Sequence, residues 1–120
     1  YHAGWPYTEE LIALCGKHQN LYMSLSGVFG WYQRSPYRGY HAIGTALQWV
    51  PADKIVLGFD LPFDDLPRVV DYIKNLDMPE ELQEKWGYAQ VTDEDKAKIL
   101  GLNLAKLTGI EPVKRCKPAK

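Results

Sequence analysis

The spacing of apolar residues changes along the chain, and this change predicts helices that alternate with strands. In "EELIALCGKH", residues 9–18, apolar positions recur at helical spacing and two acids stand at the start. We therefore expect a helix with Thr8 as its N-cap, because a threonine hydroxyl can accept a free backbone N–H group. The next apolar run, "NLYMSLSG", predicts a short strand from Asn20 to about Ser24, ended by Ser26 and Gly27.

A second strand is predicted within "KIVLGFDLPF", residues 54–63. Positions 55–59 are apolar with little alternation, which is typical of a parallel strand buried on both faces. The run ends on Asp60, and apolar residues flank this carboxylate on both sides. The residues alone leave two interpretations of Asp60: a turn residue at a strand end, or a functional carboxylate at the carboxyl end of a parallel strand, where α/β enzymes place their chemistry.

The remaining segments predict further helices and one long loop. "GVFGWYQRSPYRGY", residues 27–40, is rich in glycine and aromatic residues, and we expect an irregular loop of the kind that serves as a lid or binding loop. Helices are predicted at about 38–50, after a cap at Asp64 or Asp65, from Pro79 onward, and from a cap at Thr92 to a stop at Gly109. Alternating strands and helices predict the α/β class with a parallel sheet.

Length and charge limit the classes of partner. A chain of 120 residues with a net charge of −1 fits one domain, has no general attraction for nucleic acid or anionic membranes, and contains no apolar run of membrane-spanning length. We expect neither a nucleic-acid nor a membrane partner. Cys15 and Cys116 lack paired metal-binding spacing and predict reduced thiols of a cytoplasmic protein, with a single disulfide as the alternative. Residues 111–120 predict a basic, solvated C-terminal tail.

The start of the chain suggests a piece of a larger protein. The sequence opens with Tyr1 rather than methionine, and its second residue, His2, is already a candidate site residue. Two or three parallel strands can neither close a barrel nor be covered on both faces. We therefore expect that a longer polypeptide carries further strands.

The order of motifs resembles a known enzyme group. "HAGW", "NLYMSLSG", "KIVLGFDLPF" and "ILGLNLAKL" follow one another as similar motifs do in the closing third of the amidohydrolase superfamily. They are most similar to its amidohydrolase-related branch, which includes aminocarboxymuconate-semialdehyde decarboxylase and aromatic-acid decarboxylases. The resemblance spans about residues 1–107. It implies that residues 1–110 are the C-terminal portion, about strands 6–8 with their helices, of a (β/α)8 TIM barrel.

The resemblance also implies roles for two residues. His2 would close the sixth strand and Asp60 the eighth, so that both face the mouth of the barrel. His2 would act as an acid–base or substrate-polarising group, and Asp60 as a ligand of a divalent metal, zinc or manganese, and as a proton acceptor. Such a metal lowers the pKa of bound water, whose proton a neighbouring carboxylate or imidazole can then take. Considered without the resemblance, His2 is a polar residue near the chain terminus.

Several positions depart from the family pattern. Phe59 stands where serine or threonine is usual, Leu61 where tyrosine is common, and Ser24 where an acid is frequent. The family's first-strand His-x-His motif and fifth-strand metal histidine have no counterpart. Catalytic metal sites normally use three or more protein ligands, so we do not expect these 120 residues alone to form a competent metalloenzyme.

Other residues are weaker candidates. Trp5 either lines a substrate pocket or packs on the helix behind it, while Trp31 and Arg34 belong to the predicted loop. An arginine there either clamps a substrate carboxylate with paired hydrogen bonds or is solvated. His18 and His41 are expected to lie at the surface or to pack between helices. Trp49 and Trp86 are expected to be packing residues, and Asn103 to have a structural role.

These observations predict part of a metal-dependent enzyme, a hydrolase or carboxy-lyase that hydrolyses or non-oxidatively decarboxylates a small carboxylated compound, aromatic or not. The expected partners are this small-molecule substrate and either a second copy in a homodimer or the missing N-terminal barrel portion. The alternative is a small non-catalytic α/β binding or assembly domain. A metal that the full-length protein retains and that Asp60→Asn loses would favour the enzyme. Unchanged metal content in that variant would count against it.

Overall fold

Two short parallel strands lie at the centre of a mostly helical fold. The computed structural model describes residues 1–112. Strand β1 (Met23–Ser24) pairs with β2 (Ile55–Val56), with Met23 opposite Ile55 and Ser24 opposite Val56. The predicted α/β class with a parallel sheet is confirmed. Both strands are shorter than predicted. Directly after β2, the backbone N–H of Leu57 bonds to the carbonyl of Ile99 at 3.0 Å.

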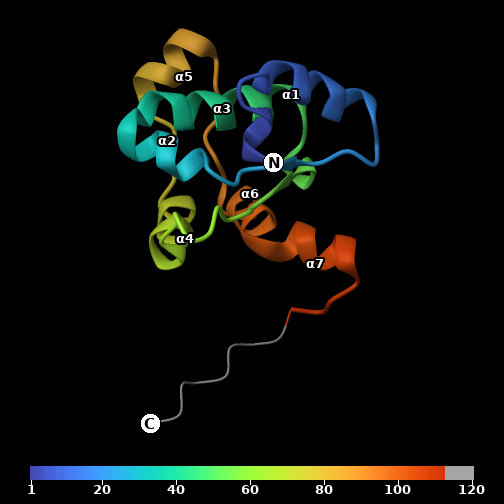
Figure 1. Ribbon diagram of the computed structural model, residues 1–120. Helices are drawn as coiled ribbons and strands as arrows, with labels where there is room; N and C mark the ends of the chain where they lie inside the picture. Colours follow the sequence, from blue (N-terminus) through green and yellow to red (C-terminus); the bar gives the residue numbers. More distant parts are fainter. Residues whose placement is uncertain (113–120) are drawn as a thin grey trace.

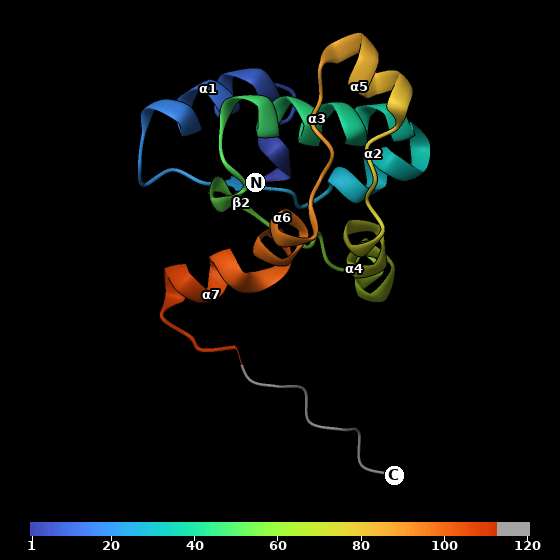
Figure 2. The same ribbon diagram turned by 180° about the vertical axis from the view of Figure 1, so that it is seen from behind.

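Helices surround this strand pair on two sides. In chain order they are η1 (His2–Gly4), α1 (Thr8–Lys17), α2 (Val28–Arg34), α3 (Pro36–Trp49), η2 (Ala52–Lys54), α4 (Leu66–Lys74), α5 (Glu80–Trp86), α6 (Asp93–Ala97), the π-helical η3 (Lys98–Leu102) and α7 (Asn103–Thr108). Figures 1 and 2 show α1 and α3 side by side above the strands, with α4, α6 and α7 below them. Above the strands, α3 packs against both α1 and α2.

The two faces of the strand pair differ in burial. Met23, Leu25 and Ile55 are buried, whereas Val56 and Gly58 are only half buried. Side chains alternate between the faces of a strand, so one face meets the helices and the other stays partly open. The prediction that residues 55–59 are buried on both faces is therefore wrong for the described chain.

Several predicted helix ends are confirmed. The Oγ1 of Thr92 accepts the backbone N–H of Asp95 at 3.1 Å, and Asp95 in turn accepts the N–H of Thr92, which forms a complete capping box. Asp65 caps α4, and Gly109 ends α7 in a left-handed conformation. The cap of α1 was predicted wrongly: Thr8 is already helical, Tyr7 precedes it as the N-cap, and no side chain bonds the free N–H groups.

The predicted loop at 27–40 is also wrong, because this segment forms α2 and the beginning of α3. Its aromatic side chains gain tertiary contacts that offset the poor helix propensity of its glycines. The ring centroid of Phe29 lies 5.7 Å from that of Tyr72, and the rings of Tyr32 and Tyr72 lie 4.1 Å apart. Residues 28–34 thus form a helix that packs against α4, although their local sequence favours a loop.

The predicted final helix is interrupted near Gly101, which has an extended φ of 175° within η3. Beyond it, Asn103 is buried, and its Nδ2 donates hydrogen bonds to the carbonyls of Ala52 (2.7 Å) and Ile55 (2.8 Å). These bonds attach α7 to the beginning of β2. The predicted structural role of Asn103 is confirmed.

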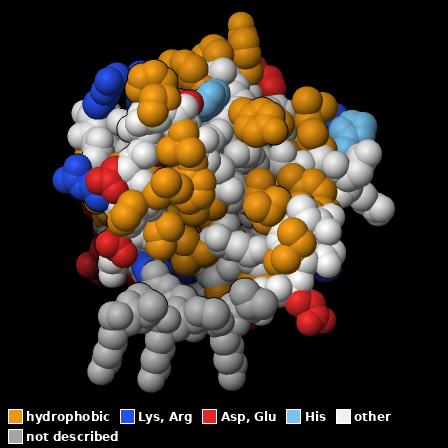
Figure 3. All heavy atoms as spheres, turned by 60° about the horizontal axis from the view of Figure 1, so that its bottom comes forward, with side chains coloured by type: hydrophobic (Ala, Val, Ile, Leu, Met, Phe, Trp, Pro, Cys, Tyr) orange, Lys and Arg blue, Asp and Glu red, His pale blue; other side chains and the backbone are white. Residues whose placement is uncertain are grey.

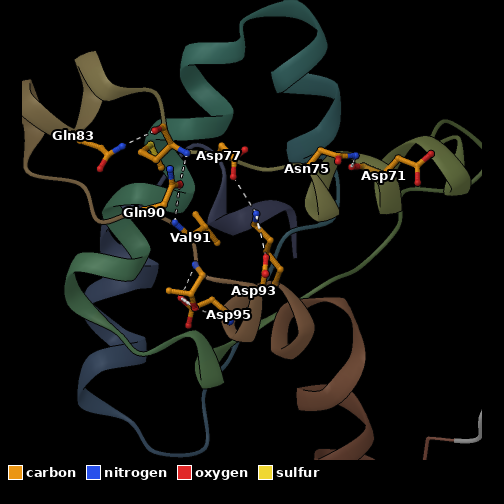
Figure 4. A network of polar contacts seen from close by, with 11 residues as sticks. Asp71, Asn75, Asp77, Gln83, Gln90, Val91, Asp93 and Asp95 are labelled. Atoms are coloured by element: carbon orange, nitrogen blue, oxygen red, sulfur yellow. Dashed lines mark hydrogen bonds and ion pairs between the residues drawn. The ribbon is translucent and has the colours of Figure 1, made fainter.

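A network of polar contacts orders the connections between α4, α5 and α6 (Figure 4). The Oε1 of Gln90 accepts the backbone N–H of Met78 at 2.6 Å, and Gln83 Nε2 donates to the carbonyl of Met78 at 2.7 Å. The ammonium of Lys96, a residue only 9% exposed, pairs with Asp77 at 3.1 Å. Backbone groups that lack helical partners are satisfied in this way.

Part of the surface is apolar. Figure 3 shows apolar side chains gathered on the side of the molecule where α7 lies, and Leu104, Leu107 and Ile110 are each about half exposed or more. Trp49 is 74% exposed, so its predicted packing role is wrong. Within residues 1–112, none of the helices combines the length and the apolar character that crossing a membrane requires. Cys15 is a buried free thiol, whereas Cys116 and most of the predicted tail lie outside the described residues.

Candidate functional site

His2 begins a left-handed turn beside the carboxyl end of β1. His2, Ala3 and Gly4 have φ values of 52°, 49° and 74°. The backbone N–H of His2 donates to the Oγ of Ser26 at 3.0 Å, and Ser26 is 2% exposed. Ser26 lies two residues after β1, so the structure brings His2 to the edge where the strands end.

The ring of His2 contacts the same loop. Its Nδ1 lies 3.2 Å from the carbonyl oxygen of Ser26, within hydrogen-bonding distance. Gly27 follows with a φ of 75°, and a Cβ atom at that position would lie only 2.7 Å from Nδ1. The imidazole therefore lies directly against a glycine that has no room for a side chain.

The segment after β2 reaches the same edge through Gly58. A Cβ at Gly58 would lie 2.5 Å from Ser24 Oγ and 3.1 Å from the Cβ of Ser26. The hydroxyls of Ser24 and Ser26 are 3.4 Å apart. Since the carboxyl ends of parallel strands meet at one edge of a sheet, His2, both serines and Gly58 form one cluster there.

Asp60 follows two residues later and heads a tight turn. Its carbonyl accepts the backbone N–H groups of Phe63 (2.8 Å) and Asp64 (3.0 Å), and its own N–H donates to Asp64 Oδ2 at 2.5 Å. The Asp60 residue is half buried. No hydrogen bond or ion pair joins Asp60 to His2 in residues 1–112.

A separate pocket of about 500 Å³ lies between the start of α1 and the helices α2 and α3. Trp5 and Trp31 both line it, with their ring centroids 5.2 Å apart. The guanidinium of Arg38 lies over the Trp5 ring, 5.1 Å from its centroid, in cation–π geometry. Two of the predicted substrate-binding residues thus share one pocket.

Arg34, the third predicted binding residue, is exposed and is not among the residues that line this pocket. Arg38 lines it instead, four residues further along the chain and in the next helix, α3. Arg38 was not among the predicted binding residues, although it begins the helix predicted at about 38–50. Helical spacing would have placed Arg38 and His41 on one face of α3.

His41 extends the polar lining of the pocket into the protein. Its Nδ1 forms a hydrogen bond with the hydroxyl of Tyr88, which also lies 3.0 Å from Thr45 Oγ1. Burial raises the pKa of Tyr88, and the Thr45 bond lowers it in part. The Tyr37 ring stacks on His41 with centroids 5.8 Å apart. The predicted packing role of His41 is confirmed.

Comparison with known protein families assigns the chain to a family. A model of the family described as amidohydrolase matches residues 1–110. The chain belongs to the amidohydrolase family. No curated protein and no solved structure matches it. Membership in the amidohydrolase family indicates a hydrolase-type parent enzyme.

Amidohydrolases are generally metal-dependent, so the side chains that could ligate a metal decide whether this chain can form a metal centre. Among residues 1–112, no three His, Cys, Asp or Glu side chains lie close enough together to hold a metal ion. A catalytic site needs three or more protein ligands. The described residues alone therefore do not fit a complete metal centre.

Proposed function

We propose that this chain is the C-terminal part of an amidohydrolase-type TIM barrel and contributes strands 6–8 with their helices. The parent enzyme would hydrolyse or non-oxidatively decarboxylate a small carboxylated compound. The observation that carries the proposal is the meeting of two segments at one sheet edge. His2 contacts the loop after β1, and the segment that leads to Asp60 packs against the same loop. Family membership over residues 1–110 supports the inference.

His2 and Asp60 take different roles in this proposal. His2 would transfer protons to or from the substrate, and Asp60 would be one ligand of the metal and would accept a proton. The described residues lack a group of three donors, so the other metal ligands would have to come from the proposed N-terminal barrel portion. Zinc or manganese is the proposed metal, and it would supply Lewis acidity when bound.

The pocket of about 500 Å³ that Trp5 and Trp31 line is the proposed binding site for the part of the substrate that does not react. Trp5 and Trp31 offer flat apolar surfaces, and Arg38 offers a planar set of donors that matches a carboxylate. No carboxylate forms an ion pair with Arg38 in residues 1–112. Glu9 and Glu10 line the pocket as well, so a monocarboxylate suits it better than a dicarboxylate. Arg34 stays a weaker prediction.

Metal content tests the proposal. The longest natural polypeptide that contains this sequence is purified without chelators, and its metal is measured by mass spectrometry. We expect near-stoichiometric zinc or manganese, with a large loss in Asp60→Asn. Asp71→Asn is the matched control, because Asp71 is an exposed residue of α4. Equal metal content in both variants would overturn the assigned role of Asp60 and favour a non-catalytic binding or assembly domain. Release of carbon dioxide, as opposed to water-dependent cleavage, then separates decarboxylase from hydrolase.

A further inference from the structure

We propose that Ser26 and Gly27 are positioning residues that hold His2 as the Nδ1–H tautomer and leave its Nε2 free as the reactive nitrogen. This inference rests on the proposed function, since it concerns the histidine assigned to proton transfer. It goes further by naming the reacting atom and the residues that select it.

The conformation of the turn shows that His2 is held by contacts. Residues other than glycine rarely adopt positive φ, because this conformation strains the backbone. His2 and Ala3 adopt it in succession, with φ values of 52° and 49°. Neighbouring groups must offset this cost, and backbone strain of this kind is concentrated at functional sites.

Ser26 supplies that stabilisation through its side chain. Its Oγ accepts the backbone N–H of His2 at 3.0 Å, across 24 residues of sequence. Ser26 is itself almost fully buried, and the Ser24 hydroxyl donates to the same oxygen at 3.4 Å. A buried acceptor with a fixed position anchors the start of the turn.

The backbone of Ser26 then determines the tautomer. A carbonyl oxygen only accepts hydrogen bonds, so the 3.2 Å contact with His2 Nδ1 requires a proton on Nδ1. In a neutral imidazole the other nitrogen, Nε2, consequently carries the lone pair. Nε2 is thus the atom available to accept a proton or to face a metal.

Gly27 allows the ring to approach this carbonyl. A Cβ at Gly27 would lie 2.7 Å from Nδ1 and 3.6 Å from Cε1 and Cγ, so any side chain would displace the imidazole. The left-handed φ of 75° also favours glycine here. An alanine at this position would break the Nδ1 contact without altering the histidine itself.

The experiment reads the tautomer directly from the full chain, with no metal or substrate added. Long-range ¹⁵N–¹H correlation spectra above the pKa of the imidazoles distinguish Nδ1–H from Nε2–H for each of the three histidines. We expect His2 to be the Nδ1–H form in the unmodified chain. In Gly27→Ala the ratio of the tautomers should fall by roughly 2- to 12-fold, the factor that corresponds to one net hydrogen bond.

Matched variants separate positioning from general stability. Gly30→Ala tests the effect of a methyl group on α2, because a Cβ there meets no atom within 4 Å. Ser26→Ala should shift the His2 ratio in the same direction as Gly27→Ala and serves if the latter does not fold. Ser35→Ala is its control, since the Ser35 side chain forms no capping bond. Neither control should move the His2 signals.

An Nε2–H form of His2 in the unmodified chain would overturn the inference. An unchanged ratio in Gly27→Ala and Ser26→Ala would also overturn it. The outcome is independent of the metal assay. If Asp60→Asn keeps its metal and His2 is the Nδ1–H form, the proposed enzyme site is rejected and the positioning role of Ser26 and Gly27 stands. If Asp60→Asn loses its metal and His2 is the Nε2–H form, the enzyme site stands and the positioning role is rejected.

Discussion

Replacing Asn103 by alanine should cause a large loss of stability, because this single side chain joins α7 to the start of β2. Asn103 is 5% exposed, and its Nδ2 donates to the carbonyls of Ala52 and Ile55 at 2.7 and 2.8 Å. Ala52 and Ile55 are themselves buried. Alanine therefore removes two hydrogen bonds and takes this partner from the Ile55 carbonyl, whereas the Ala52 carbonyl still accepts the backbone N–H of Ile55.

The size of the effect follows from these two bonds. Each buried hydrogen bond contributes about 0.5–1.5 kcal/mol net, and an acceptor left unsatisfied costs about 1–3 kcal/mol. Partial relaxation or entry of water lowers the sum, so we expect the free energy of unfolding to fall by about 2–4 kcal/mol. A domain of this size has about 5–15 kcal/mol in total, so the loss is a substantial fraction of its stability.

Urea denaturation followed by circular dichroism measures this change. With an m-value of about 2 kcal/mol/M, in the middle of the usual range, the midpoint should fall by about 1–2 M urea. Asn75→Ala is the matched control, because Asn75 Nδ2 also donates to a backbone carbonyl, that of Asp71 at 2.8 Å, but at an exposed site. A midpoint for Asn103→Ala equal to that of Asn75→Ala would refute the reasoning.

Four further substitutions test other contacts. Gly44→Ala should destabilise the fold by about 1–3 kcal/mol in thermal unfolding, because a Cβ there would lie 2.5 Å from the Tyr88 ring. Tyr72→Phe should be neutral or more stable by up to about 1–3 kcal/mol, because its hydroxyl is buried without a partner among residues 1–112. Tyr88→Phe loses two hydroxyl bonds and should be less stable by about 1–2 kcal/mol, so the reverse order of the two tyrosine variants would contradict this reasoning. Lys98 lowers the pKa of Asp53 through a hydrogen bond. A lowered folded-state pKa adds stability above the ordinary value of about 3.9, and this contribution disappears as pH falls. Lys98→Met should therefore raise the Asp53 pKa in an NMR titration and reduce stability at pH 7 more than at pH 3.

The sequence correctly predicted those structural features that depend on residues close together in the chain. The capping box at Thr92 and the stop at Gly109 depend on residues within a few positions of each other, and both were predicted correctly. The α/β class and the parallel pairing of β1 with β2 followed from the alternation of apolar patterns. Local reasoning was wrong at residues 27–40, where α2 packs on the distant α4.

The candidate site divides in the same way. The sequence by itself predicted His2 and Asp60 as catalytic candidates, and Trp5 and Trp31 as candidates for binding. Only the tertiary structure decided that Trp5 shares a pocket with Arg38, and that the ring of His2 lies against Ser26. Contacts between segments 24 or more residues apart depend on how the helices pack over the strands, and no local pattern in the chain encodes that geometry.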